Sequence, residues 1–174
     1  MLILCISLLV AGNETTRHLL SGTAVALAEH PDQRAVLAAS PEAIPGAVEE
    51  CLRWVTPIQV FGRTATRPTE VAGEAVDEGD FLVMLYASGN RDESVFGPSA
   101  DRLDVTRPTT PPHLGFGFGV HLCLGAALAR LEARVFLQEL LARHPRWDLA
   151  GEATWVASSL VRGQATLPVV LHPA

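Results

Sequence analysis

Hydrophobic residues recur at helical spacing in the first part of the chain. An apolar run extends from Met1 to Val10, and the helical pattern continues to Leu20. A run this short and apolar on all sides is typical of a buried helix, because it cannot cross a bilayer. A secretory signal would also need basic residues in front of it. We predict one helix through Leu20, loosened at Ser21-Gly22-Thr23, and a further helical stretch over Ala24 to Glu29.

Proline and glycine divide the middle of the chain into short elements. Helices are predicted over Asp32 to Ala39 and over Ala47 to Val55, because residues that precede proline disfavour helix and close each pattern. Alternating β-like runs follow, bounded by turn residues. The strands predicted there are Ile58 to Thr64, Thr69 to Ala72 and Phe81 to Leu85.

The last part of the chain combines an irregular segment, a long helix and a strand. Ser88 to Pro112 is rich in Asn, Asp, Pro and Arg, and irregular segments of this length tend to be functional. An amphipathic helix is predicted over Leu124 to Arg143, and a closing strand over Leu167 to Leu171. The apolar positions of that helix are Leu124, Leu128, Leu131, Val135 and Leu141. Together the elements predict a mainly α fold with small β-sheets (α+β).

Composition narrows the class of protein. The 174 residues make up about one domain, and the hydrophobic fraction of 48% is typical of globular proteins. The net charge is −6, lysine is absent and the 13 arginines are scattered, which argues against a nucleic-acid-binding protein. The three cysteines, Cys5, Cys51 and Cys123, show no disulfide spacing and favour a reducing compartment.

The segment from His113 to Arg130 (HLGFGFGVHLCLGAALAR) carries the strongest chemical signal. Glycines alternate with phenylalanines ahead of Cys123, and the predicted long helix follows directly. Glycine lets the backbone turn and approach a bound group, and free N–H groups at a helix start favour a thiolate over a thiol. A lone cysteine would more often be a buried residue beside a turn. The coincidence of glycines, histidine and helix start favours a metal-binding thiolate instead.

These residues resemble a known family. The run Phe116-Gly117-x-Gly119-x-His121-x-Cys123-x-Gly125 is similar to the haem-binding loop of the cytochrome P450 superfamily, in its bacterial soluble form. The resemblance implies that Cys123 binds the iron of haem b as a thiolate, with Phe116, Gly117 and Gly125 around the haem. It also implies a cytoplasmic monooxygenase that activates O2 and hydroxylates a small apolar organic substrate. Electrons would come from NAD(P)H through a ferredoxin-type redox partner, without a membrane anchor.

The opening helix resembles the oxygen-binding motif of the same family at Ala11-Gly12-Asn13-Glu14-Thr15-Thr16. The small Ala11 would leave room for dioxygen, and the Thr15 hydroxyl can bond back to the Ala11 carbonyl and bend the helix locally. The resemblance implies that Glu14 and Thr15 form an acid–alcohol pair that relays protons to bound oxygen. Ala11, Val60 and Phe61 are expected to face the substrate.

Further matches concern structural and haem-contacting residues. Glu50 and Arg53 lie three residues apart on one helix face and predict an ion pair. The resemblance makes this pair, with His113 as its third partner, a structural element of the haem-binding core. Arg63 and His121 resemble residues that bind the haem propionates, which are carboxylates and suit the planar fork of arginine.

The resemblance covers nearly the whole chain, but members of the family are more than twice as long. We therefore expect residues 1–174 to be the C-terminal, haem-binding half of a single cytochrome P450 domain, beginning inside the long central oxygen-binding helix. Such a half is expected to fold poorly and to be inactive alone, because its apolar opening helix would face water. Two other interpretations stay open: a haem-binding remnant without catalysis, and a zinc-supported interaction domain that uses His113, His121 and Cys123.

Overall fold

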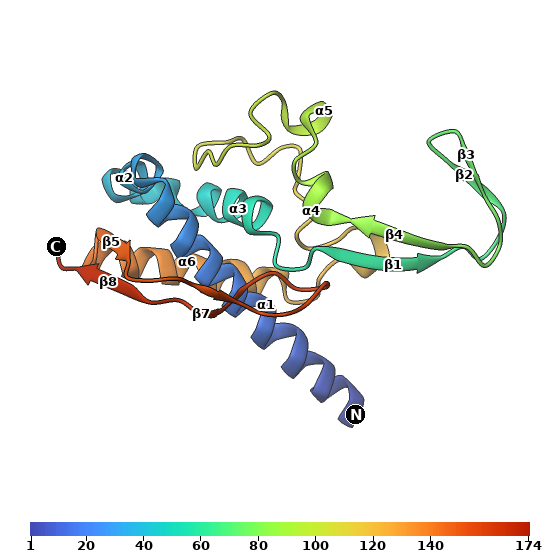
Figure 1. Ribbon diagram of the computed structural model, residues 1–174, viewed down its shortest axis with the longest axis horizontal. Coiled ribbons are helices and arrows are strands. Elements are labelled where there is room, and N and C mark those ends of the chain that lie inside the picture. Colours follow the sequence, from blue (N-terminus) through green and yellow to red (C-terminus); the bar gives the residue numbers. More distant parts are fainter.

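Helix α1, Leu2–Glu29, is the longest element of the computed structural model, which describes residues 1–174 (Figure 1). The helix is continuous, so the prediction of a loosened segment at Ser21-Gly22-Thr23 is wrong. Gly22 lies where α1 packs against helix α3 (Ile44–Val55), and a side chain at this position would overlap that of Val55. The glycine therefore allows a close approach of two helices and does not interrupt one.

The other helices are shorter. They are α2 (Pro31–Ala39), the 3₁₀ turn η1 (Pro41–Ala43), α3, α4 (Tyr86–Gly89), α5 (Glu93–Phe96), the 3₁₀ turn η2 (Gly119–His121) and α6 (Ala126–Arg143). Helix α3 begins at Ile44, before the predicted Ala47. Pro45 is tolerated in its first turn, because the backbone N–H groups of that turn have no partner within the helix and the missing N–H of proline costs no bond. Helix α6 begins after the predicted Leu124. None of the helices combines the length and the hydropathy that a membrane-spanning segment needs.

The strands form four separate two-stranded antiparallel sheets, which pair β1 with β4, β2 with β3, β5 with β8 and β6 with β7. Their bounds are β1 Val60–Thr64, β2 Thr69–Val71, β3 Glu74–Val76, β4 Phe81–Leu85, β5 Arg146–Leu149, β6 Thr154–Trp155, β7 Gln164–Thr166 and β8 Val169–His172. The predicted strands correspond to β1, β2, β4 and β8. The other four, β3, β5, β6 and β7, were not predicted.

The core lies between α1, α3 and α6, with Trp147 of β5 buried among them. Its largest apolar members include Leu19, Leu27, Leu37, Ile44, Leu52 and Leu137. The Trp147 indole N–H donates to the Ala24 carbonyl of α1 at 2.8 Å. The Arg34 guanidinium of α2 lies 4.7 Å from the Trp147 ring and donates to the Trp147 carbonyl at 2.7 Å. The tryptophan therefore joins β5 to both helices.

Two apolar helix faces lie at the surface. The first ten residues of α1 project away from the rest of the chain (Figure 1), and their large apolar side chains are at least 52% exposed. The sequence pattern is typical of a buried helix, and in residues 1–174 alone the run faces water, as expected for a chain that lacks the elements that would cover it. Of the stripe predicted for α6, only Leu141 is buried, while Leu124, Leu128, Leu131 and Val135 are 44–86% exposed. Helix α6 is apolar on two faces, and sequence spacing alone does not show which face meets the core.

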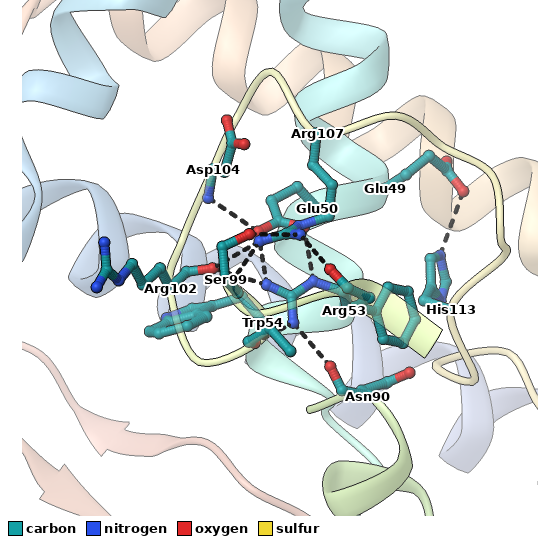
Figure 2. Close-up of polar contacts among 12 residues, drawn as sticks. Glu49, Glu50, Arg53, Trp54, Asn90, Ser99, Arg102, Asp104, Arg107 and His113 are labelled. Carbon is teal, nitrogen blue, oxygen red and sulfur yellow. Dashed lines mark hydrogen bonds and ion pairs between the residues drawn. The ribbon is translucent and has the colours of Figure 1, made fainter. Parts of the chain in front are cut away.

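A buried cluster of charges fixes the irregular segment, Ser88 to Pro112, against α3 (Figure 2). Glu50 and Arg53, with side chains 1% and 2% exposed, meet in two parallel contacts of 2.7 Å, which confirms the predicted ion pair. Arg107 adds a contact of 3.1 Å from its Nε to Glu50 Oε2. The expectation that His113 is this third partner is wrong. His113 Nε2 lies 3.2 Å from Oε2 of Glu49 instead, because successive helix residues point about 100° apart.

The two arginines of the cluster also fix the backbone of the irregular segment. They donate at 2.7–3.1 Å to the carbonyls of Asn90, Phe96, Ser99, Ala100 and Arg102. The Asp104 N–H in turn donates to Glu50 Oε1 at 2.9 Å. Buried charges are tolerated when they are paired and hydrogen-bonded. The segment therefore takes the course that satisfies Arg53 and Arg107.

Glu50→Gln should lower the free energy of unfolding by about 3–5 kcal/mol, because two buried arginines would lose their counter-charge while the side-chain size hardly changes. Urea unfolding of the two proteins measures the difference. Arg102→Gln is the matched control, since the Arg102 side chain is exposed and approaches Asp101 only to 4.0 Å. The control should change stability by less than about 0.5 kcal/mol. Equal effects of both substitutions would contradict a central role for the cluster.

Candidate functional site

The loop from His113 to Gly125 connects the irregular segment to α6 and presents Cys123 close to the start of that helix. Gly117 and Gly119 have φ angles of +71° and +68°, in the left-handed region that favours glycine. They turn the chain back, so that the Cys123 N–H donates to the Phe116 carbonyl at 2.9 Å. The glycine pattern thus gives the cysteine a defined position.

Cys123 differs from the other cysteines in its surroundings. Its side chain is exposed and unpaired, and it precedes the N-terminus of an 18-residue helix, where free N–H groups and the helix dipole favour an anionic ligand atom. Cys51 is buried in α3, and burial raises the pKa of its thiol to about 12. Cys5 is exposed on the projecting end of α1. Cys123 is therefore the one thiol that a turn presents at a helix start.

Two side chains contact the ring of Phe116, a residue of the loop. The Arg130 guanidinium lies 4.6 Å from the centre of the Phe116 ring, and the His113 ring lies 5.6 Å from it. The phenylalanine is half-buried and packs against the hydrophobic core. Because its carbonyl also accepts the Cys123 N–H, the ring and the cysteine are fixed relative to each other.

A carboxylate of α3 joins the two residues that hold Phe116. Glu49 accepts hydrogen bonds of 2.7 and 2.8 Å from Arg130 and lies 3.2 Å from the His113 ring (Figure 2 shows the His113 contact). Partial burial alone would raise the pKa of Glu49, but the bonds from Arg130 and His113 outweigh it and lower the pKa to about 2. Sequence reasoning missed Glu49 and Arg130. The available signal was an arginine about one turn into the helix that follows the cysteine.

Strand β1 and the cysteine loop meet at Tyr86. The centres of the Phe61 and Tyr86 rings are 5.9 Å apart, and a Cβ built at Gly117 would lie 3.8 Å from the Tyr86 hydroxyl. Val60 begins the strand and is half-buried, while Phe61 is exposed. The structure thus brings Phe61, predicted to face the substrate, to the neighbourhood of the loop.

Two residues are predicted to bind the haem propionates, Arg63 and His121. Both have side-chain N–H groups that are free to bind a carboxylate. Arg63 is half-buried on β1, and its guanidinium donates to the Gly62 carbonyl at 2.8 Å, which occupies one of its five N–H groups. His121 is exposed in η2, two residues before Cys123. Their role in binding a propionate stays a prediction.

The surface beside the cysteine is apolar and open. The large apolar side chains there are at least 59% exposed: Phe118, Val120, Leu122 and Leu124. Haem is a flat, mostly apolar ring system whose iron can be held by one thiolate, and it fits such a surface. A structural zinc ion needs about four protein ligands. No group of three or more His, Cys, Asp or Glu side chains is placed to hold a metal ion, so the arrangement expected for a zinc-supported domain is not formed. The donor set fits haem.

The predicted oxygen motif lies where α1 passes from its exposed end into the core. The Thr15 hydroxyl donates to the Ala11 carbonyl at 2.6 Å, which confirms the predicted bond. Glu14 turns toward the C-terminal side of the helix, where Arg17 Nη2 lies 3.1 Å from both carboxylate oxygens. His18 Nε2 lies 3.2 Å from one of them. Sequence reasoning singled out neither Arg17 nor His18.

Sequence comparisons with known proteins agree with one another. A sequence model of the family described as Cytochrome P450 matches residues 1–149. Linalool 8-monooxygenase from Pseudomonas putida is 45% identical over 165 residues, which are 95% of this chain and 40% of that protein. Putative cytochrome P450 126 from Mycobacterium tuberculosis is 45% identical over 162 residues, 93% of this chain and 39% of the relative. The chain thus spans about 40% of the length of the curated relatives it matches.

Solved structures show the same likeness in three dimensions. Cytochrome P450-153 from Novosphingobium aromaticivorans superposes with a TM-score of 0.91 at 43% identity, over 97% of this chain and 42% of that one. P450BioI, solved in complex with acyl carrier protein ligated to hexadec-9Z-enoic acid, gives a TM-score of 0.92 at 40% identity, over 97% and 44% of the two chains. The predicted fold class, mainly α with small sheets, is confirmed.

The lowered pKa of Glu49 makes its contribution to stability pH-dependent. The unfolded carboxyl titrates near 4.5 and the folded one near 2, so the contribution is complete above pH 4.5 and is lost as the pH falls toward 2. Glu49→Gln should lower the free energy of unfolding at pH 7 by about 1–2 kcal/mol and flatten its acid dependence in that window.

Urea unfolding at neutral and acid pH measures both effects of the Glu49 substitution. Glu139→Gln is the control, because its pair with Arg143 is exposed at 2.6 Å and should contribute less than about 0.5 kcal/mol. An unchanged pH profile in Glu49→Gln would remove this carboxylate from the support of the loop.

Proposed function

Because the chain belongs to the cytochrome P450 family, we propose that residues 1–174 form the haem-thiolate part of a monooxygenase that activates O2 and hydroxylates a small apolar organic substrate. The observation that carries the proposal is the thiol of Cys123. It is exposed, it follows a turn built on Gly117 and Gly119, it stands before α6, and it lies beside an open apolar surface. A single thiol presented in such a setting would suit a sulfur ligand of haem iron.

When bound, haem b supplies the redox chemistry that activates O2, with electrons that we propose come from NAD(P)H through a ferredoxin-type partner. Cys123 would hold the iron through its sulfur and donate electron density to it. The space beside Gly125 is open and would leave room for the haem: a Cβ built there would have one atom within 4 Å, the Cys123 sulfur at 4.0 Å. Arg63 and His121 would bind the propionates through charge-assisted hydrogen bonds. Phe116 would keep water from the sulfur side.

Residues of α1 and β1 would act on oxygen and substrate. The Thr15 hydroxyl, fixed on the Ala11 carbonyl, and the neighbouring Glu14 carboxyl would hold and move protons, while the small Ala11 side chain leaves space. Val60 and Phe61 offer apolar contacts for a substrate. One similar protein is named for linalool, and another was solved with acyl carrier protein ligated to hexadec-9Z-enoic acid. These two apolar molecules support the proposed substrate class.

Cys123→Ser should abolish the long-wavelength absorption of a reduced, carbon-monoxide-bound haem-thiolate, because a serine hydroxyl does not replace the sulfur ligand. The test uses a fused protein, in which all 174 residues are joined to the part of linalool 8-monooxygenase that they do not match. Cys51→Ser should keep the band, since that thiol is buried in α3. A band retained in both variants would refute the assignment of the ligand.

Thr15→Ala in the fused protein should preserve substrate binding and release reducing equivalents as peroxide or water. The reason is that the hydroxyl places a proton and does not contact the substrate, and acid–base assistance contributes about 10²–10⁴-fold to rate. The amount of product formed per NAD(P)H consumed is the measurement. Unchanged coupling would exclude Thr15 from proton delivery.

The alternative function, haem binding without catalysis, applies to the 174-residue chain by itself. The projecting end of α1 and the outer face of α6 expose large apolar side chains, a surface that favours self-association. Residues 1–174 alone should therefore elute as aggregates or dimers and lack hydroxylation with a surrogate oxidant. A monodisperse monomer that unfolds cooperatively and turns over would contradict this.

A further inference from the structure

One buried side chain of α1 has no part in the function proposed above. His18 is 0% exposed, and its ring makes one polar contact, 3.2 Å from Nε2 to Oε2 of Glu14. The other ring nitrogen, Nδ1, is buried and has no hydrogen-bond partner. Buried polar atoms are nearly always bonded, so an unpartnered ring nitrogen requires a reason.

The His18 ring is closed off by the segment that leads into β7. Gly163, itself buried, lies so close that any side chain at this position would overlap the His18 ring. This segment is fixed by its backbone, because Gly163 accepts a 3.0 Å bond from the Val156 N–H and the Arg162 N–H donates to the Pro57 carbonyl at 2.8 Å. Neither water nor a second partner can therefore reach Nδ1.

The closed nitrogen determines where the ring carries its proton. A neutral imidazole has one N–H and one acceptor nitrogen. An N–H at Nδ1 would be buried without an acceptor and would lose the bond that Nε2–H can make to a carboxylate. The proton of His18 therefore lies on Nε2, from which it donates to Glu14.

We propose that His18 is a positioning residue for Glu14 and lies outside the proton path, an inference that rests on the role proposed for Glu14 above. A histidine that relays protons takes one up at one nitrogen and releases one at the other, and Nδ1 of His18 has no partner for this exchange. Its Nε2–H instead holds one carboxylate oxygen from the core side. Arg17 holds both oxygens from the solvent side at 3.1 Å.

This arrangement excludes one route for protons to Glu14. Because Nδ1 of His18 is closed and has no partner, no proton reaches Glu14 through His18. Without the Nε2–H donor, the carboxylate keeps only the exposed Arg17 as an anchor. The carboxylate then holds its position less well, and fewer of the consumed electrons end in product.

The first test examines the geometry and needs no activity. Histidine ring ¹⁵N signals are recorded in the fused protein before haem is added. The expected result is a His18 ring that carries its N–H on Nε2 and none on Nδ1, with an Nε2 signal that moves in Glu14→Ala. A ring that carries an N–H on Nδ1 would overturn the proposal, and so would an Nε2 signal that is unchanged in Glu14→Ala.

The second test separates positioning from packing with two substitutions of His18. His18→Gln places an amide N–H near the position of Nε2, whereas His18→Phe fills the same space without a donor. Product per NAD(P)H should stay within about twofold in the first variant and fall about two- to tenfold in the second, the loss that one net hydrogen bond represents. His30→Phe is the control: His30 is a half-buried histidine of the same chain that bonds to the Ala26 carbonyl, and this change should leave coupling unaltered.

The outcomes distinguish the inference from the function on which it rests. Equal coupling in His18→Gln and His18→Phe, or a better result for the phenylalanine, would show a packing role and overturn the proposal. If the unmodified fused protein lacks the haem-thiolate band, the proposed function fails while the ¹⁵N result still decides the position of the His18 proton. If His18→Phe fails to fold, His18→Leu takes its place with the same expected loss.

Discussion

The carboxylate of Glu50 lies where water does not reach it, and the segments around it are arranged to compensate its charge. Arg53 and Arg107 pair with it, and their remaining N–H groups need acceptors that backbone carbonyls supply. Between α5 and η2 the chain contains no helix or strand of its own to fix its course. Its conformation follows from the bonding requirements of two arginines, which are directional and therefore more demanding than apolar packing.

The same constraint extends to the cysteine loop through Asn90. The Asn90 carbonyl accepts from Arg53, and its side-chain oxygen accepts the Leu114 N–H at 2.7 Å. Leu114 is the second residue of the loop that leads to Cys123, so the course of the loop is tied to α3 at its beginning as well as to α6 at its end. Under the proposed function, the iron ligand is in place before any haem arrives, and binding would require little rearrangement of the backbone.

Features carried by neighbouring residues could be predicted from the sequence, and features that depend on distant segments could not. The turn before Cys123 and the bond from the Thr15 hydroxyl each involve residues a few positions apart, and both are present. Gly22 was taken for a weak point of a helix, because the sequence does not show that Val55 of another helix packs against it. The third partner of Glu50 comes from a segment without periodicity. On α6, two apolar faces have similar spacing, and only the packed fold distinguishes them.

Helix α1 is half in water and half in the core, so one continuous helix contains two regimes of local stability. In residues 1–174 alone, amides in its exposed part open at little cost in free energy, whereas amides beyond Leu19 open only when the surrounding core opens. Ala11 and Thr15 lie on the boundary between the two regimes. The hydroxyl that the proposed mechanism needs is therefore attached to the last turn that can unwind independently. In residues 1–174 alone, the lifetime of that turn, measurable by amide hydrogen exchange, limits how long the oxygen motif keeps its geometry.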